Sequence, residues 1–222
     1  MDLSQLEKNF ESALLKGDSA NTVEKAVTYC NGCQQARKYD TSIICLKKLL
    51  IIVEKDKSLR AVVLTALGTA YWEKAQLKKA LEQFEKALLL FNEMDDKAGK
   101  AAILSIVAIT YWRKCAWDQA LEILEDALNQ KSDREERFAS LYGAFDRGIS
   151  TLKNRIRLGR ELGQPLKILQ PLFSSTAIHL IMRNMAELTI CLDESEALAK
   201  KTSQTDILKA IIGISNLAAK VL

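Results

Sequence analysis

The residues of this chain best suited to chemistry are its five cysteines and its single histidine, His179. Cys30 and Cys33 stand in a Cys-x-x-Cys motif, and Cys45 is the nearest third thiol. Two thiolates at this spacing can chelate zinc or exchange with a disulfide. Both residues, however, fall on positions with helical packing periodicity, and free cysteine is among the residue types most often buried. We therefore predict small buried side chains here, with no metal and no cofactor.

The chain lacks the residue sets that usually build an active site. It has one histidine, no glycine-rich phosphate loop, no nucleophile beside a base and no carboxylate–histidine metal motif. Asp95 and Asp96 lie in an expected connector, where a carboxylate typically caps a helix. The sequence therefore predicts a protein that is not an enzyme.

Three cations, Lys153, Arg157 and Arg160, recur at helical spacing and form a basic stripe. Between residues 147 and 167 only Glu161 offsets the positive charge. Such a stripe can contact an acidic partner or the phosphates of RNA. The alternative is a solvated helix face on which Glu161 pairs with Arg157. Because no aromatic residues are interleaved and the formal net charge is only +4, a nucleic-acid partner is not expected.

The composition indicates a helical protein from a reducing compartment. Only two of the 222 residues are proline and nine are glycine, while 48% are hydrophobic. An odd number of scattered cysteines does not suggest a disulfide framework. The first residues carry neither a basic cap nor an apolar stretch, and no apolar run is long enough for a membrane helix. We expect a soluble cytoplasmic protein without a membrane segment.

The organisation of the chain follows from an internal repeat. Residues 61–90 and 101–130 match at a fixed offset of 40, with eleven identical positions in thirty. Self-similarity at such a period is typical of stacked supersecondary units that cannot bury their apolar faces alone. Within each unit the apolar residues mark one face of each of two successive helices. The repeat therefore predicts a helix hairpin per unit.

The packing residues of these hairpins carry a family resemblance. The first unit reads Leu64-x-x-Leu67-Gly68-x-x-Tyr71 and then Ala80-x-x-x-Phe84-x-x-Ala87. The second reads Leu104-x-x-Val107-Ala108-x-x-Tyr111 and then Ala120-x-x-x-Leu124-x-x-Ala127. Both patterns resemble the signature of the tetratricopeptide repeat. The 40-residue period exceeds the usual ~34 and resembles the long-repeat branch of rapsyn and the Leu-Gly-Asn repeat scaffolds.

The resemblance implies an all-α fold, a right-handed superhelical solenoid of antiparallel helix hairpins with about 10–11 helices. We expect a single solenoid over residues 1–222. An N-terminal helix and a degenerate repeat would cover 1–57, two clear repeats 58–131, and divergent helices 132–222. The degenerate repeat aligns Cys33 with Tyr71 of the first clear repeat.

Several helix boundaries can be predicted from capping and proline signals. Asn21 with Glu24 forms a capping-box pattern that predicts the start of a helix. The helical pattern that precedes Leu162 is long for one repeat helix, and Gly148 is a candidate bend. Pro165 suits the first turn of the next helix, in which Pro171 predicts a kink or a restart.

In this family the first helix of each hairpin lines a concave groove that holds peptides or partner helices. The resemblance implies that the groove residues are Asn31, Gln34, Thr65, Thr69, Trp72, Ser105, Ile109, Trp112 and Arg113. Tryptophan and arginine are common at binding hot spots, which favours Trp72, Trp112 and Arg113. The alternative for the two tryptophans is packing between neighbouring repeats.

The C-terminal segment is apolar around most of its expected helix, including Ile207, Ile211, Ile214, Leu217 and Val221. An end cap of a solenoid needs a polar outer face. We expect self-association to cover these residues; a fold-back of the basic helix or a further domain are the alternatives.

Together these features predict a non-enzymatic scaffold or adaptor that binds a peptide or helix of another protein in the concave groove. One alternative is a sensor module that binds a small ligand or a signalling peptide and controls an attached effector. The other is a binder of RNA or an acidic partner through residues 147–167.

Overall fold

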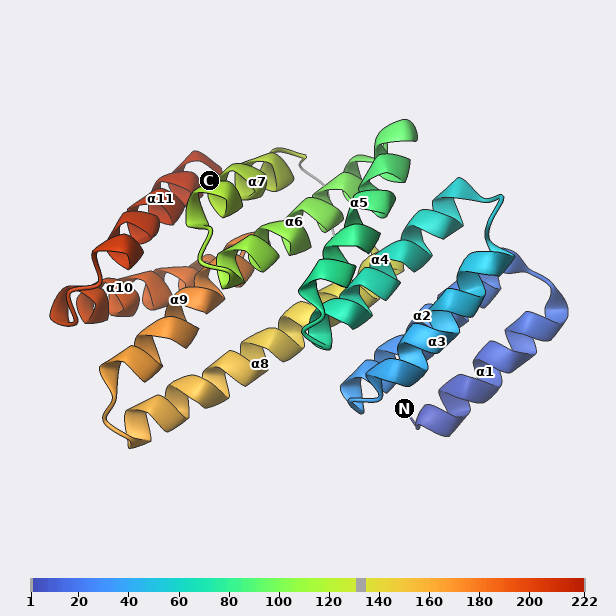
Figure 1. Cartoon of the computed structure of the whole chain (residues 1–222), viewed down its shortest axis with the longest axis horizontal. Helices are drawn as coiled ribbons and strands as arrows, with labels where there is room; N and C mark the ends of the chain where they lie inside the picture. The colour runs from blue at the N-terminus through green and yellow to red at the C-terminus, as the bar shows by residue number, and fades with distance from the viewer. Residues whose placement is uncertain (1, 131–134, 222) are drawn as a thin grey trace. The chain divides into compact units, whose positions relative to one another are not determined.

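The computed structural model describes residues 2–130 and 135–221, without the side chain of Val221. Within those residues all regular structure is helical, with eleven α-helices, one short 3-10 helix and no strand. The elements shown in Figure 1 are α1 (Leu3–Lys16), α2 (Ser19–Gln35), α3 (Tyr39–Ile52), α4 (Lys57–Glu73), α5 (Leu77–Glu93), α6 (Lys97–Arg113), α7 (Trp117–Asn129), η1 (Glu136–Phe138), α8 (Ala139–Glu161), α9 (Pro165–Ile181), α10 (Met185–Lys201) and α11 (Thr205–Val221). The predicted all-α fold and number of helices are confirmed.

The chain divides into two compact units. Unit 1 comprises residues 1–103 and 131–144, and thus holds α1 to α5, the start of α6, η1 and the start of α8. Unit 2 comprises residues 104–130 and 145–222, and thus holds the rest of α6 and α8 together with α7 and α9 to α11.

In unit 1 the helices α1 to α5 pack against one another in sequence order. The turn between α4 and α5 is closed by a bond from the Gln76 amide to the Tyr71 carbonyl, 2.9 Å long. The α2–α3 turn has the same bond, from the Lys38 amide to the Cys33 carbonyl at 2.8 Å. In its turn, Cys33 therefore holds the place that Tyr71 holds in the α4–α5 turn.

The signature residues of the first clear repeat bring its two helices close together. Ala80, Phe84 and Ala87 of α5 are fully buried. A Cβ atom added at Gly68 of α4 would lie 2.5 Å from the Phe84 ring. Glycine is needed here because the ring occupies the space that a larger side chain would fill.

Two predicted boundaries differ from the structure. Helix α2 begins at Ser19, not at Asn21, because the Asp18 carboxylate accepts bonds from the amides of Ala20 and Asn21. Pro171 lies inside α9, so the predicted restart is wrong, and α8 is a single helix through Gly148.

Close packing of α8 accompanies the proline in α9. Pro171 has no amide hydrogen, so the Lys167 carbonyl four residues earlier loses its helical partner. Gly159 of α8 lies against this carbonyl, where an added Cβ would come within 2.9 Å of the oxygen. The absence of a side chain at Gly159 therefore lets the two helices approach.

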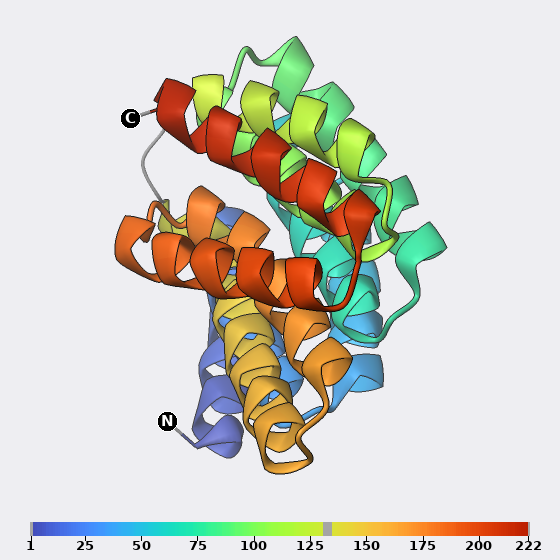
Figure 2. The ribbon, with the colours of Figure 1, turned by 90° about the vertical axis from the view of Figure 1, so that its left-hand side faces the viewer.

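Unit 2 contains a further hairpin of the same kind, formed by α9 and α10. Its turn is closed by a 2.9 Å bond from the Asn184 amide to the His179 carbonyl, and the α6–α7 turn by a bond from the Ala116 amide to the Tyr111 carbonyl. His179 thus stands where the clear repeats carry their signature tyrosine. Helix α11 follows and packs against α10, α9 and α7 (Figure 2).

Across residues 2–130 and 135–221 no helix combines the length and apolar character required to cross a membrane.

Candidate functional site

Unit 1 places its predicted groove residues in the interior. Gln34, Thr65 and Thr69 are 2% exposed or less, and Trp72 is 5% exposed. Asn31 is half-buried. These side chains therefore do not line an open groove in this structure.

Their surface is covered by η1 and the first residues of α8, which we call the 135–144 segment. In unit 1, η1 contacts α4. The Ser140 hydroxyl donates a 3.1 Å hydrogen bond to Oε1 of Gln34, whose Nε2 donates a 3.3 Å bond to the Ser42 hydroxyl. All three side chains are buried, where polar groups need such partners. Gln34 therefore contacts this chain itself at the place where a partner was expected.

Arg137 and Phe138 anchor the segment. The Arg137 guanidinium donates two hydrogen bonds to the Asp96 carboxylate, 2.5 and 2.9 Å long, and also pairs with Glu135. Phe138 is 1% exposed and meets the Phe91 ring edge-on, with centroids 5.7 Å apart. The guanidinium lies 4.7 Å from the centre of the Phe138 ring.

The electrostatics of this anchor favour the charged pair. Burial disfavours charge on Arg137, but its hydrogen bonds with Asp96 and Glu135 outweigh burial and raise its pKa. Burial likewise opposes ionisation of Asp96, yet Arg137 and the amide of Gly99 hold the Asp96 pKa below its usual value. Asp96 accepts that amide bond at 2.9 Å, so it also caps α6, as predicted.

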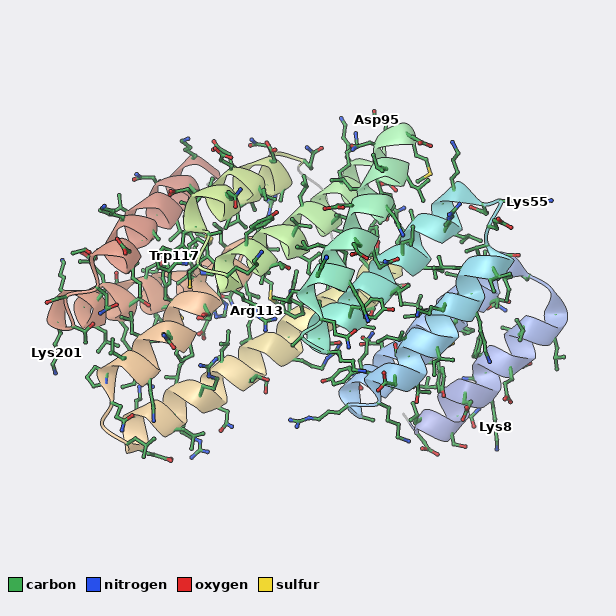
Figure 3. The ribbon with its side chains drawn as sticks, viewed as in Figure 1. Lys8, Lys55, Asp95, Arg113, Trp117 and Lys201 are labelled. Atoms are coloured by element: carbon green, nitrogen blue, oxygen red, sulfur yellow. The ribbon has the colours of Figure 1, made fainter. Side chains whose placement is uncertain are left out.

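The groove residues predicted in unit 2 are mostly buried as well. Ser105, Ile109 and Trp112 are 7%, 1% and 2% exposed. The Trp112 indole donates a 3.1 Å bond to the Phe173 carbonyl of α9, and the two rings are 4.8 Å apart. Trp112 therefore packs against α9 within unit 2. Arg113 is exposed at the end of α6, and Trp117 follows at the start of α7 (Figure 3).

The Cys-x-x-Cys motif lies in the core of unit 1. Cys30 and Cys33 are fully buried on packing positions of α2, as predicted, and the Cys30 thiol donates to the Ser42 carbonyl at 3.7 Å. Burial raises the pKa of the Cys33 thiol. No cluster of three or more histidine, cysteine or acidic side chains within the described ranges could hold a metal ion.

The basic stripe lies on α8 of unit 2, and its three cations already face carboxylates of the same chain. Arg160 donates to both oxygens of Glu194 at 2.7 Å, and the Lys153 ammonium is 3.9 Å from Glu187. Arg157 pairs with Glu161 four residues later, as predicted. Exposed pairs of this kind contribute little to stability.

Below the stripe, α8, α9 and α10 enclose a cleft of about 410 Å³. Ile156, Leu172 and Ile190 contribute apolar walls, while Ser175, His179 and Cys191 contribute polar groups. The Ser175 hydroxyl lies 3.3 Å from the Cys191 sulfur. His179 is 2% exposed, and burial lowers its pKa.

Sequence reasoning missed the polar side of this cleft, because α9 and α10 match the clear repeats in too few residues. Aligning the turn of this hairpin with the turns of the clear repeats would have identified these polar positions. Once Tyr71 and Tyr111 are aligned with His179, Ser175 falls on the place of Leu67 in the first repeat.

The apolar face of α11 is covered within unit 2. Ile211, Ile214 and Leu217 are 4%, 0% and 4% exposed, and Ile207 is half-buried. Lys220 pairs with Glu125 of α7 at 3.1 Å. The side chain of Val221 lies outside the described residues. Helices α7, α9 and α10 pack against α11, so its buried face is covered without a second copy of the chain.

Comparisons with known proteins agree with the hairpin architecture. Residues 59–133 match the family model of the tetratricopeptide repeat. The fold is similar to the crystal structure of BtubC (BKLC) from P. vanneervenii, at 17% sequence identity and a TM-score of 0.56, with 99% of this chain and 89% of that chain covered. A Podosopora anserina putative kinesin light chain with nearly identical TPR-like repeats aligns at 16% identity and a TM-score of 0.44, covering 80% of this chain and 94% of that one. Among curated proteins, no sequence matches this chain.

The family match covers both clear repeats and supports a coarse statement of function. Tetratricopeptide-repeat proteins are generally non-enzymatic scaffolds that bind other proteins, and no catalytic family matches. Residues 59–133 of this chain are therefore tetratricopeptide repeats, within a fold that is helical throughout its described elements.

Proposed function

We propose that this chain is a non-enzymatic interaction scaffold that binds a helical segment of a partner protein on α2, α4 and α5, at the place now taken by its own 135–144 segment. The observation that carries the proposal is the bond from Ser140 to Gln34, because it puts a helix of this chain on a residue expected to face a partner. A surface that holds one short helix with buried polar and aromatic contacts is suited to holding another of the same chemistry.

The contacts of the segment specify the partner. Arg137 lies against Asp96, Phe138 against Phe91, and Ser140 against Gln34. A competing helix would therefore carry a basic residue, then an aromatic residue, and a small hydroxyl residue two positions further on.

The tethered segment competes with such a partner and lowers its apparent affinity. A segment attached to the same chain acts at a high effective concentration, often in the millimolar range. The apparent affinity for an external helix falls in proportion to the fraction of molecules whose surface is open. Weakening the segment's own anchors is therefore expected to strengthen binding of an external helix.

A fluorescent peptide copy of residues 135–146 tests this with the full chain. We expect Arg137→Ala/Phe138→Ala to bind the peptide at least tenfold more tightly than the unmodified chain, as measured by fluorescence anisotropy. Glu136→Ala is the matched control, because Glu136 is exposed in the same segment, and its affinity should equal that of the unmodified chain. A peptide with both anchor residues replaced by alanine should not compete.

The proposal fails if the double variant keeps the helicity of the unmodified chain by circular dichroism and still does not bind the peptide. Equal binding by all three chains would also contradict it, because the peptide would then attach elsewhere.

The cysteines, the repeat period and the basic stripe bear on three further parts of the proposal. All five cysteines are free, which supports placing the protein in the cytoplasm. The 40-residue period supports the long-repeat branch of the family. We do not propose RNA binding, because Glu187, Glu161 and Glu194 lie beside the three cations and offset their positive charge.

A further inference from the structure

The α9–α10 hairpin carries polar residues at positions where a clear repeat is apolar. Its turns at both ends of α10 repeat those of α5: Gln76 bonds to Tyr71 and Asn184 to His179, while Asp96 bonds to Phe91 and Gln204 to Ala199. This fixes an offset of 108 residues. The packing positions of Leu67, Tyr71 and Ala87 are then occupied by Ser175, His179 and Ser195.

These polar side chains are as buried as the apolar ones that they replace. Ser175, His179 and Ser195 are 3%, 2% and 0% exposed. Among the residues that the structure describes, Nδ1 of His179 and Oγ of Ser195 have no hydrogen-bond partner. Buried polar atoms are nearly always paired, so these two atoms leave hydrogen-bonding capacity unused inside the hairpin. Ser175 and His179 both line the cleft.

The mouth of the cleft has defined ends. Lys153 pairs with Glu187 and Arg160 with Glu194, so two ion pairs join α8 to α10. Each step, from 153 to 160 and from 187 to 194, is seven residues, or about 10 Å along a helix. Ile156 and Ile190 line the cleft between the two bridges. The volume of about 410 Å³ falls within the range of small-molecule sites.

One cation lies between the two bridges. Arg157 lines the cleft and donates to Glu161 and Asn154 of its own helix. Its side chain is 60% exposed and that of Glu161 is 55% exposed, so this pair is weak and exchangeable. Glu161 lines the cleft as well, so a bound carboxylate would take its place on Arg157. A guanidinium there can take a carboxylate through two parallel hydrogen bonds.

We propose that this cleft binds a small carboxylic acid with an apolar body, the carboxylate held by Arg157 at the mouth and the body lying between Ile156, Leu172 and Ile190. The apolar walls contribute by burial of the body, and Arg157 selects the sign of the head group. His179 and Ser175 lie beside the bound body as a polar patch. This site is separate from the surface proposed for a partner helix, so either proposal can fail alone.

The single histidine makes the test direct. In a tag-free sample of residues 1–222, the imidazole signals in a proton–carbon NMR spectrum come from His179 alone. Octanoate is the probe, in buffer of matched pH, and octylammonium and 1-octanol are its charge-reversed and neutral counterparts. We expect octanoate to shift the His179 signals in a saturable manner, with at least tenfold weaker binding of both counterparts.

Variants of α8 and α10 complete the test. Arg157→Gln should weaken octanoate binding at least tenfold, whereas Arg155→Gln, at an exposed position of α8 outside the cleft lining, should leave it unchanged. Ile190→Trp should abolish it by filling the mouth, since Ile190 is 59% exposed at the cleft. The proposal is overturned if octanoate gives no saturable shift, if 1-octanol binds equally well, or if Ile190→Trp has no effect.

Discussion

At the scale of single residues, two sets of buried polar side chains differ in their pairing. Gln34, Ser42 and Ser140 satisfy one another, whereas His179 and Ser195 each keep an unpaired atom. Capping by Asp96 could be predicted, because it depends on residues three positions away. The partner of Gln34 could not, because Ser140 lies 106 residues later and no local pattern links them.

The ionisation of His179 gives a prediction at this scale. Burial favours the neutral imidazole and lowers its pKa, Glu187 acts to raise it, and Lys153 acts to lower it. The unfolded chain therefore binds more protons near its ordinary value of ~6.5, so the free energy of unfolding should fall as the pH drops through that value. An NMR titration should give a His179 pKa below ~6.5.

Two variants check the cause of this shift. Glu187→Gln should lower the His179 pKa further, and His179→Phe should flatten the dependence of stability on pH between neutral and mildly acidic conditions. A His179 pKa at or above the ordinary value would show that the imidazole is not desolvated.

At the scale of elements, the helix hairpins could be predicted from the sequence, whereas the contacts at the start of α8 could not. Apolar periodicity and the matched Tyr71 and Tyr111 define two hairpins from local sequence alone. The start of α8 lies in unit 1 because of Arg137, Phe138 and Ser140, and their contacts join residues distant in sequence. Helix α9 likewise continues through Pro171, which a local rule marks as a break.

Two glycines of α8 provide a matched prediction. Gly159→Ala would place a Cβ 2.9 Å from the Lys167 backbone, whereas at Gly148 the nearest atom is a flexible end of Ile178, 3.6 Å away. We expect Gly148→Ala to stabilise the fold by about 0.5–1 kcal/mol through helix propensity. Gly159→Ala should destabilise it by about 1–3 kcal/mol through the clash. Urea unfolding monitored by circular dichroism measures both, and equal effects would contradict the close approach of α8 and α9.

At the scale of the whole molecule, each unit covers a surface for which the sequence predicted an external partner. In unit 1 the 135–144 segment covers α4, and in unit 2 helices α7, α9 and α10 cover α11. Composition and periodicity show that Ile211, Ile214 and Leu217 must be buried, but they do not show which helix buries them. An apolar face is therefore predictable from sequence, while its occupant depends on tertiary contacts.

The central claim is that this chain places its own 135–144 segment on a surface expected to face a partner. A double-mutant cycle between Gln34→Ala and Ser140→Ala tests it most directly, because the two side chains share a buried hydrogen bond. We predict a coupling free energy of about 0.5–1.5 kcal/mol by urea unfolding of the full chain. Additive effects of the two substitutions, with no coupling, would contradict the claim.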